Sequence, residues 1–161
     1  VLCRELGCQG VVTGVLLHDN TIDVERTAKL KEAAGTMEFI YHRAFDCTPD
    51  PIAAIKTLKK LGVDRILSSG GKKSAIEGLP LLKELQRIGN GKPMIMPGGG
   101  INAESIVQIK AAGFSEVHFS GMVLGATGIK LPFSFMTERF LDEEKRGVSD
   151  REIIRKIMGN G

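Results

Sequence analysis

Residues 61–67 read LGVDRIL: a helical pattern ends at a glycine, a short turn follows, and a β-rich run begins. The same design recurs at residues 6–12 (LGCQGVV) and 112–118 (AGFSEVH). Strand starts along the chain are spaced by about 22 to 29 residues, which is the size of one βα unit. Alternating βα units predict a parallel sheet with right-handed crossovers.

Five β-rich runs follow this spacing, and amphipathic helical patterns separate them. We predict strands at residues 10–16, 37–43, 65–69, 94–96 and 116–120. The Asp50-Pro51 pair predicts a helix start, because a capping side chain precedes a first-turn proline. The sequence Ser149-Asp150-Arg151-Glu152 predicts a last helix that begins with a capping box.

The arrangement of glycines and polar residues selects the kind of parallel sheet. They gather after successive strands, as in a (β/α)8 TIM barrel, whereas no strand is followed by the G-x-G-x-x-G of dinucleotide-binding folds. A barrel needs eight strands and typically about 250 residues. We therefore expect residues 1–161 to form one partial barrel domain that lacks about three N-terminal βα units. Either the absent N-terminal residues or another chain must cover its open strand edges, and we expect a homo-oligomer.

The composition is that of a globular protein, with 42% hydrophobic residues, 25% charged residues and a formal net charge of +3. No apolar run reaches the roughly 18 residues of a membrane-spanning helix, so we expect no membrane partner. The weak charge and the lack of tryptophan argue against nucleic acid. Three cysteines without C-x-x-C spacing favour a reducing compartment, and we predict a cytoplasmic protein.

Side-chain alternation places polar groups on one face of the predicted sheet. Successive side chains of a strand face opposite sides, and the side under the helices must be apolar. We assign to that side Phe39, Tyr41, Val117 and Phe119, and to the lumen Glu38, His42, Glu116, His118 and Ser120. Buried charges need partners, and we expect Arg65 to neutralise both glutamates near the amino ends of the strands.

Three candidate catalytic residues fall near the carboxyl ends of the strands, where barrels place their sites: His42, Asp46 and His118. Either histidine could bind a ligand or transfer protons. Asp46 could orient an imidazole, act as a base, or only begin the turn before Thr48. Arg43 could bind an anionic substrate or pair with a helix carboxylate. These alternatives stay open on the sequence alone.

The glycine run at Gly98, Gly99 and Gly100 lets the backbone come close to a ligand. The helix predicted to begin at Asn102 adds unpaired N–H groups. Together with Ser120 and Gly121 after the next strand, this pattern predicts a phosphate-binding loop of the kind found late in barrels. The alternative is a tight turn without a ligand.

Sulfur-containing side chains are the candidate ligands for soft metals. Met94 and Met96 share a strand face and could bind Cu(I), or could simply fill the core. Cys47 lies beside Asp46 and could be reactive. Cys3 and Cys8 are five residues apart across a helix-to-strand junction, and we do not expect them to share a metal.

Several motifs together resemble the CutC family over roughly Leu6 to Ser120. The matching motifs are YHRAFD at 41–46, MPGGGI at 96–101, Gly14-Val15-Leu16, Ser69-Gly70, and SAIEGLPL at 74–81. The resemblance implies a (β/α)8 barrel of which this chain supplies about strands four to eight. It also implies a cytosolic copper-homeostasis protein with copper binding, and it adds Ser69 and Gly70 to the expected ligand-binding residues.

Three functions therefore compete, and one of them is a non-catalytic, oligomeric scaffold whose polar groups in the lumen bond only to one another. The other two are more specific. The first is copper homeostasis with Cu(I) binding, which the family resemblance implies. The second is a barrel enzyme that acts on a small anionic or phosphorylated substrate through His42, Asp46 and His118 above the glycine loop. Neither the reaction nor the substrate can be derived from the residues, and the metal ligands stay unassigned.

Overall fold

The structure is a computed structural model that describes residues 2–126 and 145–159. These residues divide into two compact units, each described on its own. The first unit holds the residues up to Ile101 together with Ser105–Phe119, and the second holds Asn102–Glu104 and the residues from Ser120 onward.

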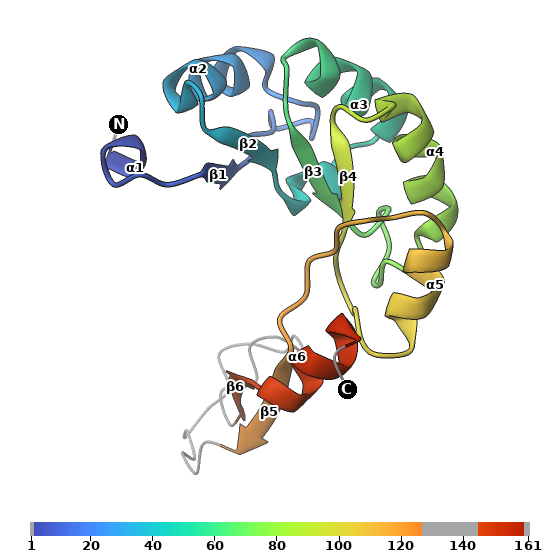
Figure 1. Cartoon of the computed structure of the whole chain (residues 1–161). Helices are drawn as coiled ribbons and strands as arrows, with labels where there is room; N and C mark the ends of the chain where they lie inside the picture. Colours follow the sequence, from blue (N-terminus) through green and yellow to red (C-terminus); the bar gives the residue numbers. More distant parts are fainter. Residues whose placement is uncertain (1, 127–144, 160–161) are drawn as a thin grey trace, which may run out of the picture. The chain divides into compact units, whose positions relative to one another are not determined.

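A parallel four-stranded sheet forms the centre of the first unit (Figure 1). Its strands lie in the order β1 (Gly10–Thr13), β2 (Glu38–Tyr41), β3 (Arg65–Ser68) and β4 (Met94–Pro97). Val11 pairs with Phe39, and Ile66 pairs with Ile95. The predicted parallel α/β sheet is thus confirmed for four of the five strands, and β1 is an edge strand.

Helices precede, connect and follow the strands of the sheet. They are α1 (Leu2–Glu5), α2 (Val24–Ala34), the 3-10 helix η1 (Arg43–Cys47), α3 (Pro51–Lys60), α4 (Leu79–Gly89) and α5 (Ser105–Ala111). The predicted start of α3 is confirmed, because the Asp50 carboxylate accepts hydrogen bonds from the N–H groups of Ile52 and Ala53. Helix α5 is shorter than predicted and begins at Ser105, while Asn102 Oδ1 accepts a hydrogen bond from the Glu104 N–H at 3.0 Å.

The core lies between one face of the sheet and the helices that cover it (Figure 1). Phe39, Tyr41 and Ile66 are fully buried there against helix residues such as Leu58 and Leu82. This confirms the predicted orientation of Phe39 and Tyr41. Val117 also packs against this core, whereas Phe119 is only partly buried.

The fifth predicted strand, 116–120, does not form as a strand. Its contact with the sheet is a single parallel bridge between Gly98 and His118, in which the His118 N–H donates to the Pro97 carbonyl at 2.8 Å. Three residues later Gly121 takes a φ of 58°, which ends the extended backbone. A strand exists only where a neighbour continues the hydrogen-bond ladder, and here the ladder stops after one pair.

The second unit contains an antiparallel pair of strands that the sequence did not predict, β5 (Met122–Ala126) and β6 (Lys145–Ser149). Helix α6 (Arg151–Met158) follows and buries Ile157. The predicted helix is confirmed, but its N-cap is Asp150, which bonds to the N–H groups of Glu152 and Ile153. Ser149 instead donates its hydroxyl to the Ser120 carbonyl.

Candidate functional site

Three loops meet at the carboxyl ends of β2, β3 and β4. They are η1 after β2, the segment 69–78 after β3, and the glycine loop at 98–100 after β4. Arg43 Nη2 donates to Ser69 Oγ at 2.7 Å, which joins the first two loops. The Ala75 N–H donates to the Gly99 carbonyl at 2.9 Å, which joins the second to the third. The predicted clustering at the strand ends is therefore present.

Asp46 is the hub of this cluster. Its carboxylate accepts hydrogen bonds from Ser68 Oγ at 2.5 Å, from the Ser69 N–H at 3.0 Å and from the Gly71 N–H at 3.2 Å. Burial by itself would raise the pKa of Asp46, but hydrogen bonds from Ser68, Arg43, Ser69 and Gly71 outweigh it and hold the pKa below its ordinary value. A carboxylate that accepts this many hydrogen bonds is well suited to hold the loops together and poorly suited to act as a base.

Arg43 is held in a fixed position above the glycine loop. Its Nε donates to Asp46 Oδ2 at 2.8 Å, and its Nη2 donates to Ser69. Nη1 lies beside Gly99, where an added Cβ would be 3.3 Å from it. The pairing with a carboxylate is thus confirmed. It leaves Nη1, on a side chain that is 44% exposed, as the nitrogen that can face a ligand.

The glycine loop is shaped by close contacts. Gly99 has a φ of 108°, and a side chain there would crowd Arg43 and Ser69. Gly100 has a φ of 67° and lies against Ser74. The Gly98 N–H donates to the Ser68 carbonyl at 2.9 Å, so this amide completes the β3–β4 ladder instead of facing an anion.

Position 70 must be a glycine for a different reason. It has a φ of 69°, and its Cα lies so close to Gly78 that a Cβ on either residue would clash with the other's backbone. A Cβ on Gly78 would lie 1.9 Å from the Ser69 carbonyl oxygen. These two glycines let segment 69–78 fold back beside the Asp46 cluster.

His42 caps η1. Its Nδ1 accepts a hydrogen bond from the Ala44 N–H at 3.1 Å, and its ring lies against Gly14. Among the residues described, Asp46 accepts its hydrogen bonds from Ser68, Ser69, Gly71 and Arg43, and not from His42. His42 Nε2 stays the atom through which the predicted ligand or catalytic role would act.

Within the part of the chain that the structure describes, His118 is connected to the sheet by one bridge only, and the residues that follow Phe119 belong to the second unit. His118 is exposed at the single bridge to Gly98, and its Cβ packs against that glycine. Ser120 and Gly121 belong to the second unit. Their predicted convergence with the glycine loop therefore stays a prediction.

The amino ends of the strands carry a separate ionic cluster, as predicted. Arg65 donates to Glu116 through Nε at 2.7 Å and through Nη2 at 3.0 Å, and it also pairs with Glu38. Hydrogen bonds from Arg65 lower the pKa of Glu116. One arginine thus pairs with two carboxylates, and this part of the predicted lumen is structural.

The described residues contain no group of three or more histidine, cysteine or acidic side chains that could hold a metal. Met94 and Met96 alternate with the buried Ile95 and share the other strand face, as predicted, where both are partly buried. Cys47 is exposed at the end of η1. Met96 and Cys47 lie toward the candidate site, whereas Met94 is in register with Arg65 at the other end of the sheet.

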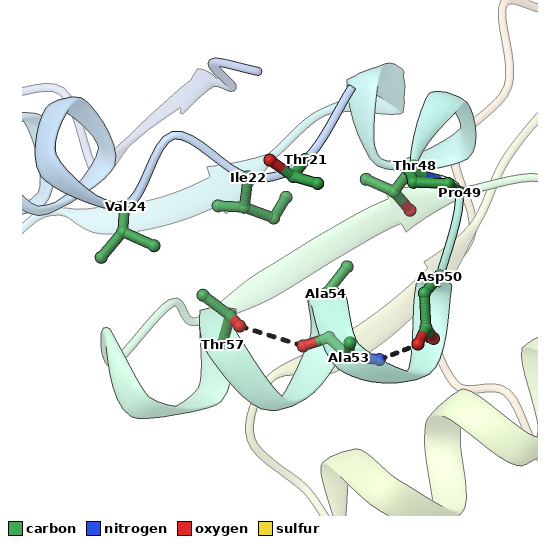
Figure 2. A pocket seen from close by; sticks show the side chains of 9 residues that line it. All are labelled: Thr21, Ile22, Val24, Thr48, Pro49, Asp50, Ala53, Ala54 and Thr57. Atoms are coloured by element: carbon green, nitrogen blue, oxygen red, sulfur yellow. Dashed lines mark hydrogen bonds between the residues drawn. The ribbon is translucent and has the colours of Figure 1, made fainter. Parts of the chain in front are cut away.

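A small pocket of about 140 Å³ opens between the segment that precedes α2 and helix α3 (Figure 2). Threonine and apolar side chains dominate its lining: Thr21, Ile22, Val24, Thr48, Pro49, Asp50, Ala53, Ala54 and Thr57. Asp50 already caps α3, and Thr57 donates to the Ala53 carbonyl. The pocket shares no lining residue with the Arg43 cluster, and we assign it no ligand.

Sequence reasoning missed three members of the site: Ser68, Gly71 and Gly78. Ser68 is fully buried, and its hydroxyl also accepts from the Gly70 N–H at 2.8 Å. The signal was the sequence Ser68-Ser69-Gly70-Gly71 at a strand end, because hydroxyls and flexible backbone together indicate a folded loop.

Among the described residues, no helix is long and apolar enough to span a membrane.

The fold and the site define an α/β protein with a parallel sheet, whose candidate site lies at the carboxyl ends of the strands. The CutC family model matches residues 1–123. The CutC family protein of Citrobacter koseri is 38% identical over 159 residues, which are 97% of this chain and 64% of the relative. That of Klebsiella pneumoniae is 46% identical over 119 residues, 74% of this chain and 48% of the relative.

A solved structure agrees. CutC from Streptococcus agalactiae, whose name refers to copper homeostasis, superposes with a TM-score of 0.67 at 33% identity. The match covers 71% of this chain and 57% of that one. The chain belongs to the CutC family, which confirms the resemblance seen in the sequence. It spans 48% to 64% of the length of the two curated relatives above.

Proposed function

We propose that this chain acts in copper homeostasis in the cytoplasm and binds Cu(I) as its cargo. Membership of the CutC family supports the proposal, as does the name of the Streptococcus agalactiae relative. We further propose that the four parallel strands and the His118 segment correspond to about strands four to eight of one (β/α)8 barrel, and that the protein is a homo-oligomer. The open edge of β1 in the described sheet needs a cover, which preceding strands of the barrel or a second chain would supply.

The donor atoms in this chain suit a soft monovalent ion. Harder metals need sets of carboxylates or histidines, and the described residues offer none with three members. Thiols and thioethers suit Cu(I). Cys3, Cys8 and Cys47 are all free and exposed, which is the single observation that favours binding of Cu(I) over other metals.

The test is a titration with Cu(I) under anaerobic, reducing conditions, with a coloured Cu(I) chelator as competitor. We expect the chain to withdraw at least one equivalent of Cu(I) per molecule from the chelator. Zn²⁺ serves as the comparison metal and should not bind with similar affinity. A chain that leaves all the copper on the chelator contradicts Cu(I) binding.

A second candidate function is an enzyme for a small anionic or phosphorylated substrate, and the geometry of Arg43 favours it. Asp46 and Ser69 fix the guanidinium so that Nη1 lies beside Gly99. A preorganised guanidinium with one free face is well suited to hold a carboxylate or phosphate oxygen. His42 and His118 are the groups proposed to move protons, while Asp46 positions Arg43.

Titration with inorganic phosphate, followed by amide NMR shifts, tests the anion site. Shifts should concentrate at Arg43, Ser69 and Gly99, and Arg43→Gln should abolish them. Gly99→Val should also abolish binding, because its side chain would occupy the space beside Arg43. Arg87→Gln, which removes an exposed arginine on α4, is the matched control. Equal loss with the control would mean that phosphate responds only to net charge.

A further inference from the structure

The junction between α1 and β1 closes with a specific pair of backbone hydrogen bonds. The Gly7 N–H donates to the Arg4 carbonyl at 3.1 Å, and the Cys8 N–H donates to the Cys3 carbonyl at 2.9 Å. Gly7 has a φ of 72°. This combination is the Schellman motif, in which the residue after the glycine bonds back across five residues.

The same motif ends α3. The Gly62 N–H donates to the Lys59 carbonyl, and the Val63 N–H donates to the Leu58 carbonyl, both at 3.1 Å. Leu58 and Val63 are both fully buried and belong to one core cluster. The long hydrogen bond thus joins two residues whose side chains enter the same packed region.

The end of α5 repeats this arrangement with other residues. The Phe114 N–H donates to the Ile109 carbonyl at 3.3 Å, across Gly113 with a φ of 88°. Ile109 is fully buried and Phe114 is 4% exposed, again in the same core cluster. Side-chain contact between the two residues joined by the long bond is a regular feature of the motif.

At the first junction this paired position holds Cys3 and Cys8. Both are free and exposed, unlike their buried counterparts at the other two junctions. The separation of five residues in sequence argued against a shared metal, but the Schellman hydrogen bonds remove that objection. They bring the backbones of Cys3 and Cys8 together at the two positions whose side chains meet in this motif, and both residues are exposed.

We propose that Cys3 and Cys8 form a dithiol site for one Cu(I) ion. Two thiolates satisfy the low coordination number that Cu(I) accepts, and soft sulfur ligands select it. Structural zinc needs four ligands, and no third histidine, cysteine or acidic side chain joins this pair within residues 2–126 and 145–159. The reaction is Cu⁺ plus two thiols giving a dithiolate complex and two released protons, with no change of oxidation state.

The inference deepens the proposed copper function and rests on it for its biological meaning. It assigns the cargo to a definite pair of atoms, at the amino end of β1 rather than at the strand ends where Arg43 lies. It also predicts that Cys47, the third exposed cysteine, takes no part. That difference makes a matched set of variants available.

The experiment compares the full chain with Cys3→Ser, Cys8→Ser and Cys47→Ser in anaerobic competition against a coloured Cu(I) chelator. Wild type and Cys47→Ser should each bind one Cu(I) tightly. Cys3→Ser and Cys8→Ser should each bind at least about 100-fold more weakly, because a second ligand in the same chain acts at a high effective concentration. X-ray absorption of the complex should show two sulfur neighbours.

Three results would overturn the inference. Wild-type affinity in Cys3→Ser and Cys8→Ser would place the copper elsewhere, which leaves the proposed copper function intact. Slow reaction of Cys3 and Cys8 with a thiol reagent in the native protein would show that the pair is covered. Failure of wild type to bind Cu(I) at all would remove this site and the proposed Cu(I) binding together. Circular dichroism of each variant confirms that its fold is retained.

Discussion

Replacing Asp46 by asparagine tests whether one carboxylate holds the three loops of the candidate site together. Both carboxylate oxygens of Asp46 accept hydrogen bonds. Whichever oxygen the asparagine NH2 group replaces, it therefore faces hydrogen-bond donors and loses the bonds that this oxygen accepted. If it replaces Oδ2, the bonds from Arg43 Nε and Ser69 Oγ are lost. Hydrogen bonds to charged groups contribute about 1.5 to 3 kcal/mol each. Arg43 is 44% exposed and can recover its bond from water, so we expect a net loss of about 3 kcal/mol.

A loss of this size is large against the roughly 5 to 15 kcal/mol by which domains are stable, so urea unfolding measures it easily. The pH dependence gives a second readout. The pKa of Asp46 is lower in the folded chain than its ordinary 3.8, so its stabilisation is present above about pH 4 and is lost as pH falls through the folded pKa. The difference between wild type and Asp46→Asn should therefore shrink in acid.

Asp19→Asn is the matched control, because the Asp19 carboxylate is fully exposed and bonds only within its own turn, to Thr21, in the contacts described. It should leave the urea midpoint unchanged. The reasoning is refuted if Asp46→Asn costs less than about 1 kcal/mol, the contribution of one ordinary hydrogen bond. It is also refuted if the cost is the same at pH 3 and pH 7.

Further predictions concern the rest of the sheet. Gly78→Ala should unfold several degrees below wild type in a thermal scan and should lose phosphate binding, because its Cβ would lie 1.9 Å from the Ser69 carbonyl oxygen. Arg65→Met should cost about 1 to 2 kcal/mol in urea unfolding, after allowance for the partial exposure of its partners, and adding Glu116→Gln should recover part of that loss. Asp64, whose pKa is lowered from 3.8 to about 2 although burial alone would raise it, should contribute about 1 kcal/mol after allowance for solvent screening. That contribution is present above about pH 4 and is lost toward pH 2, and Asp64→Asn should abolish this part of the pH dependence.

The parallel sheet was predictable because its signals are local. A glycine in the left-handed region marks the end of α3 and of α5, and a β-rich run follows the first of these junctions directly. The segment 116–120 alternates polar and apolar residues, which predicts a strand, but it forms one bridge. Its conformation depends on a neighbour that local sequence does not specify, and the β5–β6 pairing is non-local for the same reason.

The location of the site was predictable from the sequence, but the hydrogen bonds among its residues were not. The expectation that polar residues meet at the strand ends follows from parallel topology alone. Which donors satisfy Asp46 depends on how segment 69–78 folds back, and that in turn depends on the contact between Gly70 and Gly78. These glycines are eight positions apart in the sequence, and no periodic pattern links them.

Charge balance decides which end of the sheet can accept an anion. At the amino ends, Arg65 faces two carboxylates, Glu38 and Glu116, so the cluster carries a net charge of −1 and repels anions. At the carboxyl ends, Arg43 faces one carboxylate, Asp46, and the pair is neutral with Nη1 still directed at the glycine loop. A neutral, preorganised pair binds an anion without first displacing a competing carboxylate. The same sheet thus uses an arginine for structure at one end and keeps an arginine nitrogen for a ligand at the other.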